Sequence, residues 1–278
     1  MAVLLIRYAE IGLKSAPVRA RFERQLKDNI LNMLAEDGVE ALVTKRGARY
    51  YVEATDPQKA VESVRKVFGV ASISVAETCS SDLEEVCRAA AEFSVGKISE
   101  GQSFAVDARR EGSHNYTSMD LGREAGSAIF LKNEHLGIRV DLTKPDVKFF
   151  VEVRENLAYI FLDYIRCHAG LPIGTQGRII ADTSDDRGLV SAWLMMKRGC
   201  RVLPMDESNF DVLKRYDPGL RVRDRNNSKR AIAISLGTDL ASIESLDFSQ
   251  YDLPVFYPSI GMTDSEVSDL AGRIRSGF

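Results

Sequence analysis

The fold begins with residues 2–38, AVLLIRYAEIGLKSAPVRARFERQLKDNILNMLAEDG. Alternating side chains predict a strand from Val3 to Glu10. A helix follows, because Ser15 can cap it, Pro17 suits its first turn, and apolar residues then recur every three or four positions. Gly38 ends the helix. This opening therefore predicts a strand followed by one long amphipathic helix.

The next residues extend this opening into a βαββαβ order. We predict two strands joined by a turn at Gly47, then a short helix and a fourth strand; the ranges are 41–45, 49–54, 57–67 and 71–76. This is the order of the split-βαβ, ferredoxin-like arrangement.

Two further modules are expected beyond it. The second has helices over 82–98 and 119–136, and strands over 103–107, 138–142, 147–154 and 157–162. The segment Gly170–Gly174 punctuates the chain like a linker. Strands over 178–181, 200–204, 231–235 and 255–258 then alternate with helices, which predicts a parallel, doubly wound α/β sheet. The fold class is thus α/β and α+β, with domains at 1–78, 79–170 and 171–278.

Composition limits the classes of function. Of the 278 residues, 37 are lysine or arginine and 40 are aspartate or glutamate, so the net charge of −3 argues against a uniformly basic protein but allows a local basic face. No segment approaches the ~20 apolar residues of a membrane-spanning helix. Four cysteines without a C-x-x-C pair and three scattered histidines predict free thiols, no metal site and a cytoplasmic location.

Basic residues gather at the start of the first long helix. Lys14 precedes it, and Arg19 and Arg21 lie in its first turns. The guanidinium fork is rigid and always charged, which suits contact with phosphate. The alternative is a solvated face stabilised by ion pairs such as Glu23 with Lys27, and these residues taken alone favour that alternative.

A second basic segment follows the strand of the middle module. Arg109 and Arg110 lead into a polar loop, and a helix starts near Ser118. Paired arginines and the backbone N–H groups of a helix start suit an anion, and His114 and Tyr116 could stack on a base. An ordinary capped loop explains the same residues equally well.

The segment Thr183-Ser184-Asp185-Asp186-Arg-Gly188 lies between a short strand and a helix, where α/β nucleotide-binding proteins place a phosphate loop. Such a loop needs glycines so that backbone amides can close on the anion. Gly188 alone is present, and the aspartates would repel a triphosphate unless magnesium intervened. We interpret the segment as a degenerate nucleotide-binding loop.

Together these motifs resemble the tRNA 4-thiouridine synthetase (thiamine biosynthesis ThiI) family. The resemblance rests on Tyr8-Ala-Glu-Ile-Gly-Leu-Lys-Ser15, on Arg109 to Asp120, on Leu142-Thr-Lys-Pro-Asp-Val147, on Gly170-Leu-Pro-Ile-Gly-Thr-Gln176 and on Leu194-Met-Met-Lys-Arg-Gly-Cys-Arg-Val202. It covers nearly the whole chain. It implies a ferredoxin-like domain, a THUMP domain and a PP-loop α/β domain.

In that family the first two domains bind the tRNA acceptor region. The third adenylates a uridine through a PP-loop, Ser-Gly-Gly-x-Asp-Ser, and a cysteine takes part in sulfur transfer. This sequence departs at the chemistry: the paired glycines are absent, the stretch between Val202 and Ala231 is short, and no cysteine follows Cys200.

We therefore predict a tRNA-binding protein without catalytic residues, metal or cofactor of its own, served by a separate sulfur-transfer or adenylating enzyme. The expected RNA-binding residues are Lys14, Ser15, Arg19, Arg21, Arg109, Arg110, His114, Lys132 and Lys144. Two alternatives stay open: an active thiolation enzyme using ATP with magnesium, and a small-molecule transferase. Family members pair, but no segment here fixes a homodimer.

Overall fold

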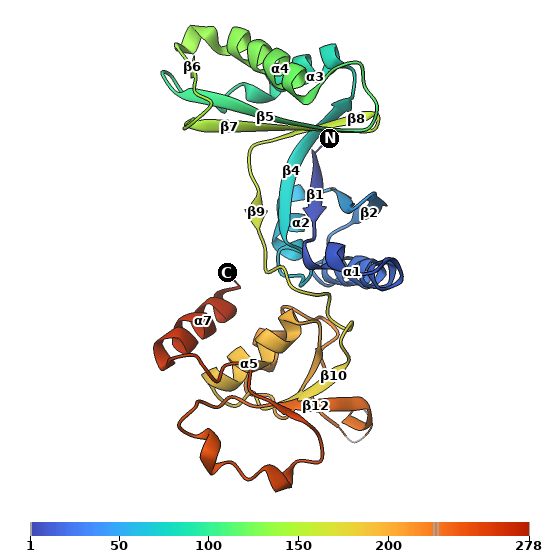
Figure 1. Ribbon diagram of the computed structural model, residues 1–278, viewed down its shortest axis with the longest axis vertical. Coiled ribbons are helices and arrows are strands. Elements are labelled where there is room, and N and C mark those ends of the chain that lie inside the picture. Colours follow the sequence, from blue (N-terminus) through green and yellow to red (C-terminus); the bar gives the residue numbers. More distant parts are fainter. Residues whose placement is uncertain (1, 225, 227, 278) are drawn as a thin grey trace. The chain divides into compact units, whose positions relative to one another are not determined.

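The computed structural model describes residues 2–224, 226 and 228–277, and the chain forms two compact units (Figure 1). Unit 1 comprises Met1–Leu5, Tyr51–Pro57 and Ile73–Ile165. Unit 2 comprises Ile6–Tyr50, Gln58–Ser72 and Arg166–Phe278. The long helix of the N-terminal module and the C-terminal α/β module thus belong to the same unit.

Unit 1 is a mixed sheet with two helices on one face. Its strands are ordered β3-β1-β4-β8-β7-β5-β6. Their bounds are Arg49–Ala54, Ala2–Arg7, Ser72–Ser80, Leu157–Phe161, Val147–Arg154, Ser103–Glu111 and Arg139–Val140. Strand β7 runs parallel to β5 and antiparallel to β8. The helices are α3 (Leu83–Ser94) and α4 (Ser118–Asn133), the latter extended by η2 (Glu134–Leu136).

Both faces of this sheet are packed. Apolar residues of α3 and α4, such as Val86 and Leu121, pack on β7 and β8. The other face has its own cluster, in which the Tyr51 and Tyr159 rings stack with centroids 5.2 Å apart. Burial on both faces accounts for the apolar runs in these strands.

Unit 2 combines the remaining N-terminal elements with the C-terminal module. The former are η1 (Glu10–Leu13), α1 (Ala16–Glu36), β2 (Ala41–Arg46) and α2 (Pro57–Val64). The latter begins after β9 (Ile165–Arg166) and contains β10 (Arg178–Ala181), α5 (Asp186–Lys197), β11 (Arg201–Pro204), α6 (Phe210–Lys214), η3 (Ser228–Arg230), β12 (Ala231–Ser235), η4 (Ile243–Ser245), η5 (Phe248–Gln250), β13 (Val255–Phe256) and α7 (Asp264–Ser276).

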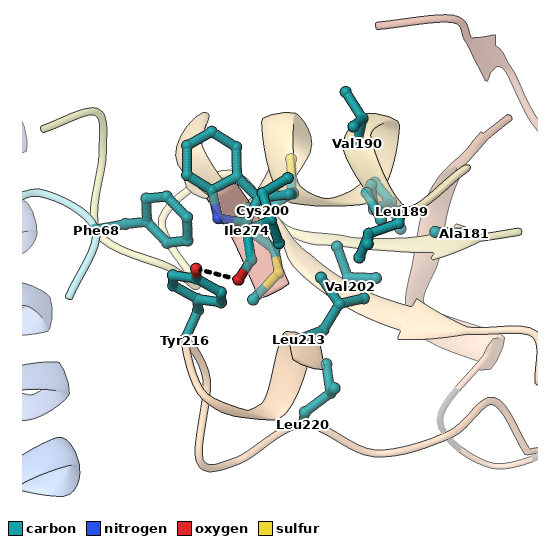
Figure 2. Close-up of a cluster of buried hydrophobic side chains, with 14 of the residues drawn as sticks. Phe68, Ala181, Leu189, Val190, Cys200, Val202, Leu213, Tyr216, Leu220 and Ile274 are labelled. Carbon is teal, nitrogen blue, oxygen red and sulfur yellow. Dashed lines mark hydrogen bonds between the residues drawn. The ribbon is translucent and has the colours of Figure 1, made fainter. Parts of the chain in front are cut away.

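The C-terminal sheet has the order β11-β10-β12-β13, and every pair in it is parallel, as predicted. Helices α5 and α7 share one large core with Ile179, Val202 and Ala233 of the strands, and Phe68 from the N-terminal module joins it (Figure 2). On the opposite face, Ile180 and Ile234 pack against loop residues such as Tyr251 and Leu253. Loops, rather than a second helical layer, therefore cover that face.

Three local expectations change in the structure. The first strand stops at Arg7 instead of Glu10, because a 3₁₀ turn begins at Glu10. Ser15 occupies the N-cap position of α1 but makes no side-chain capping bond. Strand β5 continues to Glu111, because its polar second half finds partners along β7, with Arg109 opposite Glu152.

Among the described residues, no helix is long and apolar enough to cross a bilayer. The part of the chain that the structure describes also contains no group of three or more histidine, cysteine or acidic side chains placed to share a metal ion. The four cysteines are free thiols, as the sequence predicted.

Candidate nucleic-acid interface and nucleotide loop

The start of α1, in unit 2, carries the first group of predicted RNA-binding residues. Lys14 lies just before the helix, and Ser15, Arg19 and Arg21 are exposed. The first turn of α1 contains no acidic residue. Because the first N–H groups of a helix lack partners within the helix, this end carries a partial positive charge in addition to the side chains.

Arg19 also fixes the shape of this end. Its Nη2 donates to the carbonyl oxygen of Gly12 at 2.8 Å and to that of Lys14 at 3.3 Å. These bonds hold the 3₁₀ turn against the helix start. Arg21 stays exposed, with its guanidinium carbon 5.2 Å from the centroid of the Phe22 ring. Arg19 therefore shapes the turn, whereas Lys14 and Arg21 are the better contacts for a ligand.

Glu23 is the acidic residue nearest to this group in sequence, and its carboxylate contacts Tyr8 and Lys45. It accepts a 2.5 Å hydrogen bond from Tyr8 Oη and forms an ion pair with Lys45 at 3.1 Å. Burial and the adjacent Glu23 raise the pKa of Tyr8, which keeps its hydroxyl protonated as the donor. The negative charge of Glu23 is thus taken up by the Lys45 ammonium.

In unit 1, Arg109, Arg110 and His114 lie at the end of β5 and in the following loop. Arg109 is exposed, with Nε 3.6 Å from Asp107 Oδ1. Arg110 Nη1 donates to the carbonyl oxygen of Gly112 at 2.8 Å. His114 Nε2 is 2.6 Å from the carbonyl oxygen of Glu155, so this ring ties the loop to the β7–β8 turn.

Two expectations for this loop are wrong. Tyr116 is 7% exposed, and its hydroxyl donates to the Ser81 carbonyl oxygen at 2.5 Å, so it cannot stack on a base. The start of α4 is not open to an external anion either, because Thr117 and Asp120 form a capping box there. Tyr116 is part of the apolar core of unit 1, and the Asp120 carboxylate accepts the hydrogen bonds at the start of α4.

The other two predicted cations of unit 1 lie at a different place. Lys132 is near the end of α4 and forms a 2.8 Å ion pair with Glu92 of α3. Lys144 is exposed in the loop between β6 and β7. Strand β6 pairs with the beginning of β5, whereas Arg109 and Arg110 are near its end, roughly 20 Å away at ~3.3 Å per residue. The structure therefore does not bring the five residues of unit 1 into one patch.

The predicted nucleotide loop connects β10 to α5. Its amides are bonded to the chain's own carboxylates: Ser184 N–H donates to Asp182 Oδ1 at 3.0 Å, and Gly188 N–H donates to Asp185 Oδ1 at 2.7 Å. Asp186 forms a 2.5 Å ion pair with Arg275, which lowers the pKa of its carboxyl. The helix end that would cradle a phosphate is thus capped and surrounded by carboxylates.

Backbone packing closes the same helix end. A Cβ atom at Gly237 would lie 2.3 Å from Gly188 N and 2.5 Å from the carbonyl carbon of Arg187. Gly237, two residues after the end of β12, therefore lies directly against the first turn of α5. Arg187 donates to the carbonyl oxygens of Ser259 and Met262, both at 3.1 Å, which fixes this turn further.

Thr183 is fully buried, and its carbonyl oxygen accepts a 2.7 Å hydrogen bond from Asn209 Nδ2. The contacts of Arg187, Gly237, Asn209 and Arg275 were not predicted. Their partners lie tens of residues away in the chain, so no local sequence pattern predicts these contacts.

Burial raises the pKa of three of the four thiols. Cys200 is buried in the unit 2 core, and burial raises its pKa. Burial also raises the pKa of Cys87, and that of Cys79 to about 11. Because the thiolate is the reactive form, burial lowers the reactive fraction of these three thiols at neutral pH.

Comparisons with known proteins identify both N-terminal modules. Residues 3–74 match the model of the ThiI ferredoxin-like domain, and residues 80–163 match that of the THUMP domain. Among curated proteins, a probable tRNA sulfurtransferase of Methanosarcina acetivorans is 35% identical over 98% of this chain and 81% of its own length. One from Thermoanaerobacter sp. is 38% identical over 98% of this chain and 85% of its own. The resemblance seen in the sequence is thereby confirmed.

Solved structures share the whole architecture. PH1313 from Pyrococcus horikoshii superimposes with a TM-score of 0.83 at 27% identity, covering 99% of each chain. A 4-thiouridine synthetase crystallised with RNA and ATP gives 0.80 at 22% identity, covering 99% of this chain and 85% of that one. The alignment with the M. acetivorans protein spans 335 positions against 278 residues here, so that relative has tens of residues without a counterpart in this chain.

Proposed function

The chain belongs to the tRNA sulfurtransferase family, and on that premise we propose that it binds the acceptor region of a tRNA and presents it for thio-modification. The observation that carries the proposal is the start of α1, where Lys14 and Arg21 flank a helix end with no acidic residue in its first turn. Double-stranded RNA is recognised through its shape, phosphates and 2′-hydroxyls, so cations at a helix start without an acidic residue suit it.

In unit 1 the proposed contacts are Arg109, Arg110 and His114. Arg109 is exposed at the end of β5, whereas Arg110 and His114 hold the following loop in place. Lys144 is a second, separate contact point. Lys132 contributes least, because Glu92 already neutralises its charge.

We further propose that adenylation and sulfur transfer come from a separate enzyme in the cytoplasm. The residues present do not fit the triphosphate of ATP: Asp182 and Asp185 occupy the amides of the loop, and Gly237 closes the helix end. No metal or cofactor is assigned to this chain. A homodimer is the oligomeric state that the family suggests, and sedimentation velocity measures it.

The alternative is an active, ATP-dependent thiolation enzyme. The names of the relatives favour it, because their similarity extends over 98% of this chain. In that case the loop would have to rearrange so that its aspartates hold magnesium instead of capping α5. The two functions differ in one product, pyrophosphate, which only an adenylating enzyme releases.

The proposed function is tested by titrating the protein with tRNA in a filter-binding assay at several salt concentrations. We expect log K to fall steeply with log salt, and the double variant Lys14→Gln, Arg21→Gln to bind about tenfold more weakly with a shallower slope. Arg88→Gln is the matched control, because Arg88 is an exposed arginine of α3 paired with Glu85. Binding that is insensitive to salt, or equal losses in both variants, would contradict the proposal.

A further inference from the structure

Unit 2 contains a cavity of about 410 Å³ that neither proposed site uses. It lies by the second half of α5, away from the loop at the helix start. Four segments line it: the residue after α2, the end of β9 with the residues that follow it, α5 and α7. The lining side chains that matter here are Arg65, Arg166, His168, Trp193, Lys197 and Arg273.

The cavity is strongly cationic. Arg65, Arg166, Lys197 and Arg273 face it, and none of the described residues that line it is an aspartate or glutamate. Arg65 also contacts Glu62 at 3.3 Å, at the solvent-facing side of α2. Glu62 offsets part of the Arg65 charge, so Arg166, Lys197 and Arg273 are the main cations at this opening. Their field attracts anions even on a protein of net negative charge.

The buried His168 beside these cations has a lowered pKa. The pKa of His168 is lowered to about 4, first by burial and then by the nearby Lys197 and Arg65. His168 is therefore neutral at pH 7, and the positive charge comes from the four longer side chains.

The apolar part of the cavity wall belongs to a rigid aromatic cluster. The His168 and Trp193 rings meet edge to face with centroids 5.4 Å apart, and Phe68 lies 5.5 Å from His168 and 5.2 Å from Trp193. Tyr216 closes the cluster and donates to the Ile274 carbonyl oxygen at 2.8 Å (Figure 2). Lys197 Nζ is 5.6 Å from the Trp193 ring centroid.

The backbone around the cavity is fixed as well. Leu171 N–H donates to the Lys197 carbonyl oxygen at 2.9 Å, and Gly69 N–H donates to that of Ala169 at 2.8 Å. Ala169 has φ +56°, an uncommon conformation for a residue with a side chain. A Cβ atom at Gly170 would lie 2.2 Å from the Lys197 carbonyl oxygen. Close backbone packing thus joins the segments beside the cavity.

We infer that this cavity binds a nucleotide, with its phosphate among Lys197, Arg273, Arg65 and Arg166 and its base or ribose toward the Trp193–His168 wall. A cationic rim beside an apolar wall suits a ligand that combines an anion with a flat ring, and the volume is in the range of small-ligand sites. The nucleotide is either free or the last residue of a bound RNA. This second site does not depend on the α1 contacts of the proposed function.

The test uses Trp193, the only tryptophan of the chain, as its reporter. Adenosine 5′-monophosphate is titrated into the full-length protein while tryptophan fluorescence is recorded. We expect a saturable change, and Lys197→Gln should weaken it about tenfold, because a charged hydrogen bond to phosphate is lost. Arg198→Gln is the matched control, since Arg198 is the exposed neighbour and does not line the cavity. Arg273→Gln, on the exposed side of α7, repeats the test if Lys197→Gln fails to fold.

A second arm distinguishes the two sources of the nucleotide. If only tRNA with its complete 3′ end changes the fluorescence, and Lys197→Gln removes that change, the ligand is the RNA end. If the monophosphate alone suffices, the ligand is a free nucleotide. The inference is overturned if neither probe changes the fluorescence, or if Lys197→Gln and Arg198→Gln behave alike. In that event, salt-dependent tRNA binding in the filter assay would still support the proposed function.

Discussion

Two helices of unit 2 begin in opposite ways. Helix α1 starts beside Lys14 and Arg19, Ser15 makes no side-chain capping bond, and its first turn has no acidic residue. Helix α5 starts with Asp185, whose carboxylate accepts the Gly188 N–H, and Asp186 is in its first turn. The start of α1 thus carries cations of the chain, whereas the start of α5 carries its carboxylates.

In the proposed function, this difference separates RNA binding from nucleotide binding within one chain. A built-in carboxylate at a helix start stabilises the protein by about 0.3–1 kcal/mol through the helix dipole, in addition to its capping bond. A phosphate entering at α5 would have to displace that carboxylate and lie among Asp182, Asp185 and Asp186. At α1 it meets amides and cations instead. In the proposed function, the start of α1 contacts RNA, whereas the carboxylates at the start of α5 oppose a triphosphate.

The largest predicted effect comes from the closed end of α5. Gly237→Ala should lower the free energy of unfolding by about 3 kcal/mol. The new Cβ would lie 2.3 Å from Gly188 N and 2.5 Å from the Arg187 carbonyl carbon, and these backbone atoms cannot move aside as a flexible side chain could. Urea unfolding followed by Trp193 fluorescence measures this. The control is Gly12→Ala beside α1, where a Cβ meets nothing within 4 Å, so a change under about 0.5 kcal/mol is expected. Equal stability of the two variants would show that the end of α5 is not closed.

Acid should weaken the C-terminal core of unit 2, where His168 lies beside Phe68 and Trp193. The folded-state pKa of His168 is about 4, below its unfolded value of about 6.5, so the unfolded chain binds the extra proton first. Stability is therefore full above about pH 6.5 and falls as the pH drops toward 4, by roughly 2 kcal/mol at pH 5. Urea midpoints at pH 7.5 and pH 5 measure the fall. His168→Gln should flatten the profile, and an unchanged pH dependence in that variant would assign the loss to other groups.

The smallest predicted effect compares the two caps directly. Asp185→Ala should cost about 1 kcal/mol, because the 2.7 Å bond to Gly188 N–H is lost. Ser15→Ala should cost much less, since the Ser15 side chain makes no capping bond. Thermal unfolding of the two variants in parallel separates these outcomes. Similar losses would mean that α1 is capped in solution in the same way as α5.

Local pattern in the sequence was enough for most of the elements and for the charge of α1. Strand β10 was predicted at 178–181 because its apolar run is short and bounded by polar residues. The length of β5 was missed, since only the register with β7 shows that Arg109 lies opposite Glu152. The sequence showed the three aspartates before α5 but predicted neither the cap that Asp185 forms nor the contact with Gly237, which is far away in the chain.

The cavity in unit 2 had no signal in the sequence. Arg65, Arg166, Lys197 and Arg273 belong to four segments that only the tertiary packing brings together. For Tyr116 the sequence predicted a contact that the structure lacks. An aromatic residue in a polar loop suggests base stacking, but Tyr116 is buried. Long-range packing decides both cases, and residue types alone do not encode it.

Pyrophosphate release tests the central contrast most directly. The protein is incubated with tRNA, ATP, magnesium and a persulfide sulfur donor, and pyrophosphate is measured over time. We predict no tRNA-dependent release above that of a protein-free blank, because the amides at the start of α5 are bonded to Asp182 and Asp185. Sustained release that requires tRNA would contradict the account and identify the chain as an active thiolation enzyme.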